Sequence, residues 1–130
     1  MGTQSITFEI PIPHKTLSPN ARAHWRTTSK HKKHSRTLSY LAALRHSFIV
    51  KEPWPGKECI VEATWHGRTA SCLRMDDTNA RGSLKAAEDG ITDAGVWDND
   101  KGVRWEPIKF AVDKNNPRVT ITVKHVGAAQ

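Results

Sequence analysis

Strict alternation of apolar and polar residues near both ends of the chain is the feature that most constrains its fold. The alternating apolar residues are Ile6, Phe8, Ile10 and Ile12 near the N-terminus and Val119, Ile121 and Val123 near the C-terminus. A period of two is typical of a β-strand that buries one face and exposes the other. Each such strand needs a second layer over its apolar face, so the rest of the chain must supply that layer.

Two helical patterns lie between these strands. The first spans about Ser29–Phe48, and Ser29 can cap its start. Its apolar residues recur at spacings of three and four: Leu38, Leu41, Leu44 and Phe48. The second spans about Arg81–Ala94, and Gly95 suits the stop that follows it. Its inward residues are Leu84, Ala87 and Ile91.

Two further strand patterns and the C-terminal strand complete the predicted order. Alternation over Cys59–Trp65 predicts a second strand, and strands are expected near Arg104–Val112 and at Arg118–His125 after the turn residues 115–117. Pro107 suggests that the strand near it is an edge strand or is bulged. The order β-α-β-α-β-β predicts a single α+β domain over residues 1–130, a mixed sheet with two helices packed on it. A chain of 130 residues can bury a core of its own.

Positive charge is concentrated in the N-terminal part of the chain. The net charge is +7; residues 1–51 carry nine Lys and Arg against one acid (9 − 1 = +8), and residues 52–130 carry eleven against twelve (11 − 12 = −1). The basic residues of the first predicted helix are Lys30, Lys32, Lys33, Arg36 and Arg45. A polyanion is the natural partner of such a surface, because each neutralised phosphate releases counterions. A solvated basic helix without a partner is the alternative.

Acidic residues gather in the two loops that bracket the second predicted helix. Asp76 and Asp77 precede it, and Asp98 and Asp100 follow it. A helix of roughly 14 residues is about 20 Å long, so the loops must fold back over it if the carboxylates are to meet. Carboxylates that meet would hold Mg²⁺, or Mn²⁺ in its place, and activate water for attack on a phosphodiester. The alternative is a helix entry capped by Thr78 or Asn79, followed later by a polar turn.

Lys85 lies one to two turns into the second predicted helix. It either contacts the scissile phosphate beside the acidic residues or pairs with Asp89 four residues later, which would contribute only a few tenths of a kcal/mol. The residues alone leave this choice open.

Several other classes of site find no support in the sequence. The histidines lie in a basic segment, Cys59 and Cys72 form no CxxC motif, and no HExxH occurs, which disfavours zinc. No Walker loop or GxSxG elbow is present, so neither a nucleotide cofactor nor acyl transfer is indicated. No apolar run reaches the length of a membrane span, and the N-terminus lacks a signal-peptide pattern. A reducing, cytoplasmic setting is therefore expected, without a membrane partner.

The order of these motifs resembles that of the RusA-type Holliday junction endonucleases, including their phage and prophage members. Residues 76–79 (Asp-Asp-Thr-Asn) are similar to the Asp-x-Asp-Asn segment of the family, with Thr78 where the second aspartate stands. Residues 83–91 are similar to its lysine-bearing helix, with three extra residues before Lys85. Residues 93–100 are similar to its aspartate-bearing loop, and residues 17–25 to its N-terminal Pro-Ser-x-Asn loop. The likeness spans nearly the whole chain.

The resemblance implies a Mg²⁺-dependent homodimer that cuts opposed strands of a four-way DNA junction, in a bacterial or phage-infected cell and near the nucleoid. Asp76 and Asp100 would be metal ligands, Asp77 a third if the backbone bulges there, and Lys85 the catalytic lysine. Together with the basic segment it implies DNA contacts by Asn20, Lys30, Lys32, Lys33, Arg36, Asn79 and Arg81.

Two other classes of protein stay open. Because Thr78 stands where the family has an aspartate, the protein could instead bind branched DNA with weakened or lost catalysis. A regulator that binds one duplex sequence is less favoured, because no helix-turn-helix spacing is evident.

Overall fold

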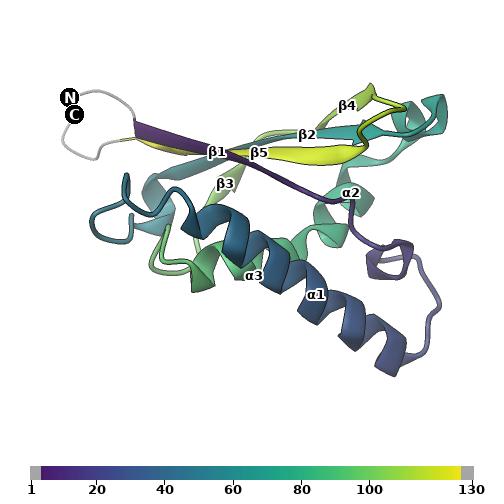
Figure 1. The fold of residues 1–130 in the computed structure, drawn as a ribbon, viewed down its shortest axis with the longest axis horizontal. Coiled ribbons are helices and arrows are strands. Elements are labelled where there is room, and N and C mark those ends of the chain that lie inside the picture. Colours follow the sequence, from purple (N-terminus) through teal and green to yellow (C-terminus); the bar gives the residue numbers. More distant parts are fainter. Residues whose placement is uncertain (1–3, 127–130) are drawn as a thin grey trace.

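A mixed β-sheet forms one layer of the structure, a computed structural model that describes residues 4–126 (Figure 1). Its strands are β1 (Gln4–Ile10), β2 (Cys59–Gly67), β3 (Arg104–Trp105), β4 (Lys109–Val112) and β5 (Arg118–His125). The order is β1-β5-β2-β3, and β4 also pairs with β2. The β1–β5 and β5–β2 pairs are antiparallel, whereas β3 and β4 run parallel to β2. The mixed sheet predicted from the sequence is confirmed.

The pairing register places the alternating residues on one face of the sheet. Ile6 lies opposite Val123 and Phe8 opposite Ile121, and these four side chains are buried. Val61 on β2 lies opposite Val123 on the other side of β5 and is also buried. A shift of one residue in any of these pairs would turn the apolar set toward water, so the core fixes the register.

Three α-helices of the described chain cover the buried face of the sheet (Figure 1). They are α1 (Trp25–Leu44), α2 (Asp77–Ser83) and α3 (Lys85–Asp93). Short 3₁₀ turns, η1 (Lys15–Leu17), η2 (Gly56–Glu58) and η3 (Ala70–Arg74), lie in the connections. The result is a single small α+β domain, as predicted, but with three helices and not two.

The close approach of α1 to α3 depends on Gly90. A Cβ atom at this position would lie 2.3 Å from the carbonyl oxygen of Arg36 and 2.9 Å from the nitrogen of Tyr40. Ser39, which is fully buried, donates a hydrogen bond of 2.8 Å from Oγ to the carbonyl oxygen of Ala87. Small residues at this crossing let the backbones approach more closely than large ones would. The two helices therefore have a fixed separation that places the basic face of α1 beside α3.

The first helix differs from its prediction in position and in its buried face. It begins four residues earlier, because the ring of His24 accepts a hydrogen bond of 3.2 Å from the nitrogen of Arg26 and caps it there. Its buried residues are Ser39 and Ala43. The apolar residues of the helical pattern lie largely outside the core, since Leu41 is 48% exposed and Phe48 is 77% exposed.

The second predicted helix is two helices joined at Leu84. Asp76 caps α2, so this helix begins at Asp77 and not near Arg81. Leu84 has φ −93° and ψ 4°, which interrupts the helix between Ser83 and Lys85. The inward side chains predicted for this region, Leu84, Ala87 and Ile91, are fully buried.

Residues 104–112 form two short strands and not one. Pro107 lies in the gap between β3 and β4, where a missing backbone donor does not break a ladder. Both strands border β2 at one side of the sheet, in agreement with the expected edge or bulge. None of the described helices is both long enough and apolar enough to cross a membrane.

Candidate active site and nucleic-acid interface

The two aspartates before α2 both make structural contacts. Asp76 is the N-cap of α2, and its Oδ1 accepts a hydrogen bond of 3.3 Å from the nitrogen of Thr78. The Oδ1 atom of Asp77 accepts a bond of 2.6 Å from the nitrogen of Ile108, which ties α2 to the connection between β3 and β4. Both residues are exposed. The capped helix entry considered from the sequence does exist, with Asp76 as the cap in place of Thr78 or Asn79.

Asp100 is carried by a loop that folds back along α3. The nitrogen of Trp54 donates to the carbonyl oxygen of Val96 at 2.9 Å, and the nitrogen of Asp98 donates to the carbonyl oxygen of Trp54 at 3.0 Å. Gly56 permits this packing, because a Cβ atom there would lie 2.4 Å from the carbonyl oxygen of Asn99. The chain before β2 therefore holds the Asp100 loop against the rest of the domain.

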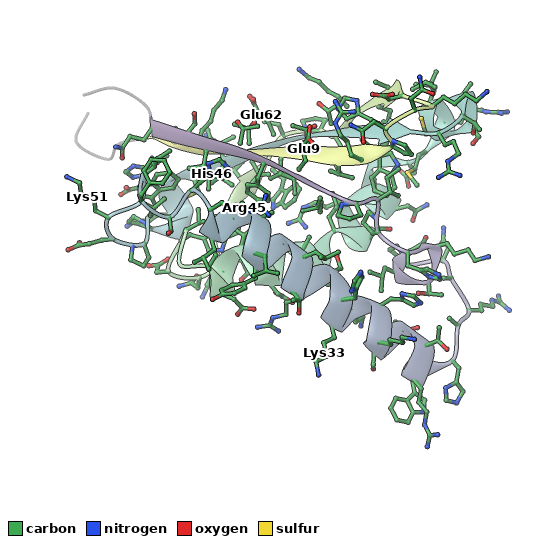
Figure 2. All side chains as sticks on the ribbon, in the orientation of Figure 1. Glu9, Lys33, Arg45, His46, Lys51 and Glu62 are labelled. Carbon is green, nitrogen blue, oxygen red and sulfur yellow. The ribbon has the colours of Figure 1, made fainter. Side chains whose placement is uncertain are left out.

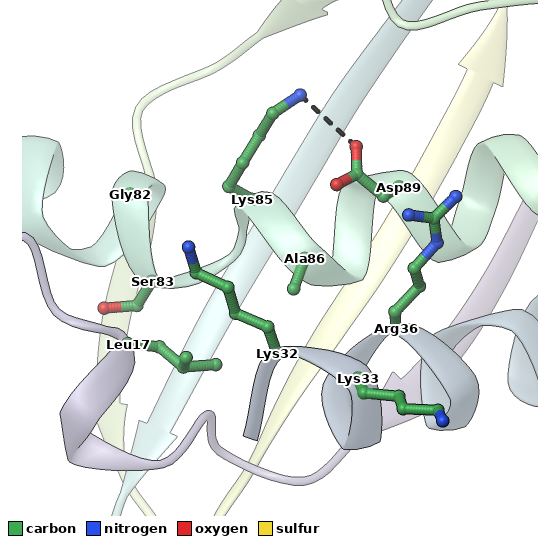
Figure 3. A pocket seen from close by; sticks show the side chains of 9 residues that line it. All are labelled: Leu17, Lys32, Lys33, Arg36, Gly82, Ser83, Lys85, Ala86 and Asp89. Carbon is green, nitrogen blue, oxygen red and sulfur yellow. Dashed lines mark ion pairs between the residues drawn. The ribbon is translucent and has the colours of Figure 1, made fainter. Parts of the chain in front are cut away.

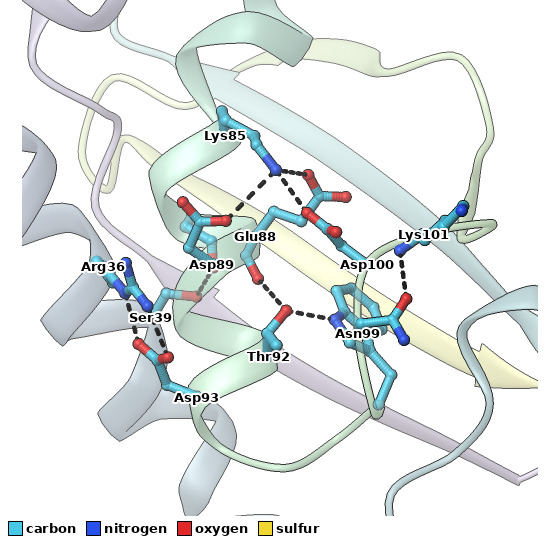
Figure 4. A network of polar contacts seen from close by, with 12 residues as sticks. Arg36, Ser39, Lys85, Glu88, Asp89, Thr92, Asp93, Asn99, Asp100 and Lys101 are labelled. Carbon is cyan, nitrogen blue, oxygen red and sulfur yellow. Dashed lines mark hydrogen bonds and ion pairs between the residues drawn. The ribbon is translucent and has the colours of Figure 1, made fainter.

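Lys85 and Asp100 meet through this arrangement (Figure 4). The ammonium of Lys85 donates to Oδ2 of Asp100 at 2.5 Å. It also lies 3.4 Å from Oδ1 of Asp89 and 3.4 Å from Oε1 of Glu88. The Lys85 side chain is 57% exposed, so its ammonium remains accessible from solvent. Asp89, the partner considered from the sequence, and Asp100 of the acidic loop are thus both within reach of the same lysine.

The contact between Lys85 and Asp100 raises the pKa of the lysine and lowers the pKa of the aspartate. The hydrogen bond from Lys85 is the main cause that lowers the pKa of Asp100, against a smaller opposing effect of burial. The same hydrogen bond raises the pKa of Lys85 above its usual range, with Glu88 and Asp89 adding to the effect. At neutral pH the site therefore holds the charged ammonium of Lys85 beside the charged carboxylate of Asp100.

The buried side chain of Glu88 contacts the basic groups of the site. Its carboxylate is nearly fully buried, and Oε2 accepts bonds of 3.2 Å from Nη2 of Arg81 and 2.9 Å from Nε1 of Trp105. The guanidinium of Arg81 lies 4.0 Å from the centroid of the Trp105 ring. Oε1 faces Lys85 at 3.4 Å. Glu88 thus fixes two cations and an indole around one carboxylate.

A cavity of about 300 Å³ opens between α1 and α3 at this cluster (Figure 3). Lys32, Lys33 and Arg36 line it from α1, and Lys85 and Asp89 line it from α3. Positive side chains from two helices therefore border one space, which suits an anionic group.

The other predicted DNA contacts are spread around this cavity. Arg36 makes a bidentate pair with Asp93, at 2.6 and 2.8 Å, which lowers the pKa of the carboxyl. Arg81 is held by Glu88 and Trp105. Lys33 points away from the sheet, whereas Glu9 and Glu62 lie at the sheet (Figure 2). Lys30 lies on α1, Asn20 is exposed in the loop before it, and Asn79 is half-buried in α2.

The predicted metal ligands do not come together as a group. No three His, Cys, Asp or Glu side chains within residues 4–126 are arranged so that they could hold a metal ion. Asp76 accepts a hydrogen bond from Thr78, Asp77 from Ile108 and Asp100 from Lys85. Mg²⁺ at the three aspartates therefore stays a prediction of the resemblance.

Two members of the cluster, Glu88 and Trp105, are absent from the residues singled out in the sequence. Glu88 follows Arg81 by seven residues and Lys85 by three, a spacing that places all three on one helical side and was available as a signal. The approach of Trp105 from β3 has no counterpart in local spacing. The tertiary fold alone brings it to Glu88.

Comparisons with known proteins add one relative. No family model matches the chain. An uncharacterized protein of Xylella fastidiosa (strain Temecula1) is 38% identical over 96 residues, which cover 70% of this chain and 57% of that protein. The chain therefore spans little more than half the length of this relative, whose description states no activity, substrate or partner.

Proposed function

We propose that this protein is a structure-selective endodeoxyribonuclease of the RusA type, which cuts opposed phosphodiesters of four-way DNA junctions in the cytoplasm during recombination and repair. One observation carries the proposal: Lys85, paired with Asp100, borders the same cavity as Lys32 and Lys33 of α1. The predicted catalytic lysine and the predicted DNA-binding helix are thus adjacent. The motif order that resembles the RusA family supports the same conclusion.

The residues of the cavity have distinct roles in this proposal. Lys32 and Lys33 neutralise backbone phosphates and so position the DNA without reading its bases. Lys85 turns its accessible ammonium to a non-bridging oxygen of the scissile phosphate, where it stabilises the charge that develops during cleavage. Asp100 and Glu88 keep the ammonium of Lys85 charged and hold it in position for the scissile phosphate.

Mg²⁺, with Mn²⁺ as the substitute, stays a prediction of the resemblance. Within residues 4–126 no three His, Cys, Asp or Glu side chains are arranged to hold an ion, so the roles proposed above are those of the chain's own residues. Asp100 and the exposed Asp76 and Asp77 are the carboxylates nearest in sequence to the family's ligands, and a metal titration decides whether they take up an ion.

A second candidate function is binding of branched DNA without cleavage. The observation that favours it is the bond of 2.6 Å between Asp77 and the nitrogen of Ile108, which holds the carboxylate that would have to replace the aspartate missing at Thr78. A protein of this kind would grip a junction through the same basic cavity.

The test is a cleavage assay on a labelled four-way junction, with Mg²⁺ and Mn²⁺ each titrated. We expect wild-type protein to cut the junction, and Asp100→Asn to bind it with unchanged affinity while the rate of cleavage falls by at least about a hundredfold, as for the loss of a catalytic group. Unchanged cutting by Asp100→Asn would remove Asp100 from the mechanism. DNA that is retarded but uncut by wild type at every metal concentration would favour the binding-only function.

Thr78→Asp is the matched gain-of-function variant. It restores the carboxylate that the family carries at this position, next to the N-terminus of α2 where negative charge is favourable. Faster cleavage by Thr78→Asp than by wild type would show that the natural site lacks a ligand, whereas equal rates would show that Thr78 is no handicap.

A further inference from the structure

A second cavity, of about 450 Å³, lies beside the candidate site. It is enclosed by residues 12–15 and Ser18, by the end of β2 and by the η3 turn that follows it. Ser83 lines both this cavity and the cavity at Lys85, so the two are neighbours. An extended ligand bound at Lys85 therefore has the second cavity as its neighbour.

The lining of the second cavity is basic and holds no acid. His14, Lys15, Arg68 and Arg74 border it, and neither Asp nor Glu does. Within residues 4–126, Lys15, Arg68 and Arg74 take part in no ion pair. The arginines of the first site differ in this respect, because Arg36 pairs with Asp93 and Arg81 with Glu88. The positive charge of the second cavity is thus left for a ligand to neutralise.

Apolar side chains also line the same cavity. Trp65, which is buried in the sheet, lines it together with the half-buried Met75 and Ile12. A ligand that satisfies both kinds of lining residue carries an anionic group and a flat apolar group. A nucleotide within a DNA strand has this chemistry, provided that its base is free of the duplex stack.

We propose that the second cavity binds an unpaired nucleotide of the branched DNA, with its phosphate at Arg68 and Arg74 and its base against the Trp65 side of the cavity. The inference rests on the proposed function, because it places a strand that has already passed Lys85. The second cavity would add a preference for unpaired over duplex DNA, which the first site does not supply. Duplex arms offer phosphates to α1, whereas an unpaired nucleotide is available at a branch point or in a single strand.

The test compares the DNA affinity of variants by fluorescence anisotropy. The DNAs are a labelled four-way junction, a single strand of thymidines and a duplex, each over a series of salt concentrations. Arg68→Gln/Arg74→Gln removes two charges from the second cavity. Lys51→Gln/Lys57→Gln is the matched control, because both lysines are exposed and neither lines either cavity; Figure 2 shows Lys51. Lys32→Gln/Lys33→Gln reports on the first cavity.

We expect Arg68→Gln/Arg74→Gln to weaken binding of the junction and the single strand by roughly tenfold or more at about 0.1 M salt, and to reduce the slope of log affinity against log salt by about one to two. The control should change affinity less than about twofold, and the duplex should lose less than the single strand. Equal losses on duplex and single strand would reduce the cavity to a general backbone patch and overturn the assignment.

The remaining outcomes separate this inference from the proposed function. Loss of binding in the Lys32/Lys33 variant, with the Arg68/Arg74 variant equal to its control, would overturn the inference alone. Wild type that binds none of the DNAs would overturn both. A measurement on unmodified protein guards against misfolded variants: in ¹⁵N NMR titrations with the thymidine strand, the amides of Gly67, Thr69 and Ser71 should shift, and unmoved signals there would also overturn the inference.

Discussion

At the scale of single residues, Glu88 has the most demanding environment in the site. Its carboxylate is 2% exposed and lies among Arg81, Lys85 and the indole of Trp105. A buried charge is tolerated when partners satisfy it, and removal of one partner leaves the others in an unfavourable state. Glu88 therefore stabilises the fold and also keeps two cations of the site in place.

Glu88→Gln should lower the free energy of unfolding by about 1–3 kcal/mol, because Arg81 and Lys85 lose their buried countercharge while the volume is kept. Urea denaturation measures this loss. Glu62→Gln is the control, since Glu62 pairs with Lys124 on the exposed face of the sheet and should contribute less than about 1 kcal/mol. Equal effects of the two substitutions would show that Glu88 is an ordinary surface acid.

The pair of Lys85 and Asp100 predicts a pH window for stability. The pKa of Asp100 is lowered by Lys85, so its contribution is complete above the unfolded value of about 3.9 and is lost as the pH falls through the folded value. The pKa of Lys85 is raised, so its contribution is complete below about 10.4 and is lost as the pH rises through the folded value. Between these limits wild type should therefore have a higher melting temperature than Asp100→Asn, and this difference should shrink as the pH falls below about 3.9. A difference that does not shrink with falling pH would contradict the pairing.

At the scale of elements, the crossing of α1 over α3 determines the geometry of the first cavity. Lys32, Lys33 and Arg36 line the same cavity as Lys85, and Gly90 lets the two backbones approach. The cap at Asp76 and the break at Leu84 set the direction in which α3 begins and hence where Lys85 points. These positions are properties of packed helices, and no single helix has them by itself.

Gly90→Ala tests this packing, because two effects of opposite sign compete. Helix propensity favours alanine by about 1 kcal/mol. The added Cβ would lie 2.3 Å from a backbone oxygen of α1, and overpacking of this kind typically destabilises by about 1–3 kcal/mol. We expect the steric clash to outweigh the gain in helix propensity, so that Gly90→Ala has a lower melting temperature and binds the junction more weakly. A higher melting temperature would mean that α1 moves aside without penalty.

At the scale of the whole molecule, one apolar stripe remains exposed on the domain. Leu41, Leu44 and Phe48 are 48%, 38% and 77% exposed and follow one another at helical spacing near the C-terminal end of α1. Exposed apolar groups of this kind often mark contacts between proteins. The homodimer implied by the resemblance needs a self-complementary patch on each copy.

We expect light scattering to give a mass twice the 14.6 kDa of one chain, and Leu41→Glu/Phe48→Glu to return it to that of a monomer. Val112→Glu is the control, since Val112 is 46% exposed on β4, away from the stripe. A dimer that survives the double substitution would place the interface elsewhere, and a monomeric wild type would contradict the homodimer.

The sequence by itself determined the parts of the structure that depend on local periodicity. The alternation in β1, β2 and β5 predicted the sheet and its buried face, and the spacing of Leu84, Ala87 and Ile91 predicted the inward side of α3. The class α+β and the mixed sheet followed from the order of these elements. The sequence also marked Lys85, Asp100 and the basic helix as residues of interest, because charge and motif order are visible in one dimension.

The tertiary structure alone decided which of these residues meet. Capping by His24 and Asp76 moved the helix starts, since a side-chain bond at the end of a helix competes with propensity over several residues. The partners of Asp100 and Glu88 come from distant segments, and Trp105 reaches Glu88 only because β3 pairs with β2. Such contacts depend on the relative placement of whole elements, which local spacing does not encode. The same placement sets the second basic cavity beside the first.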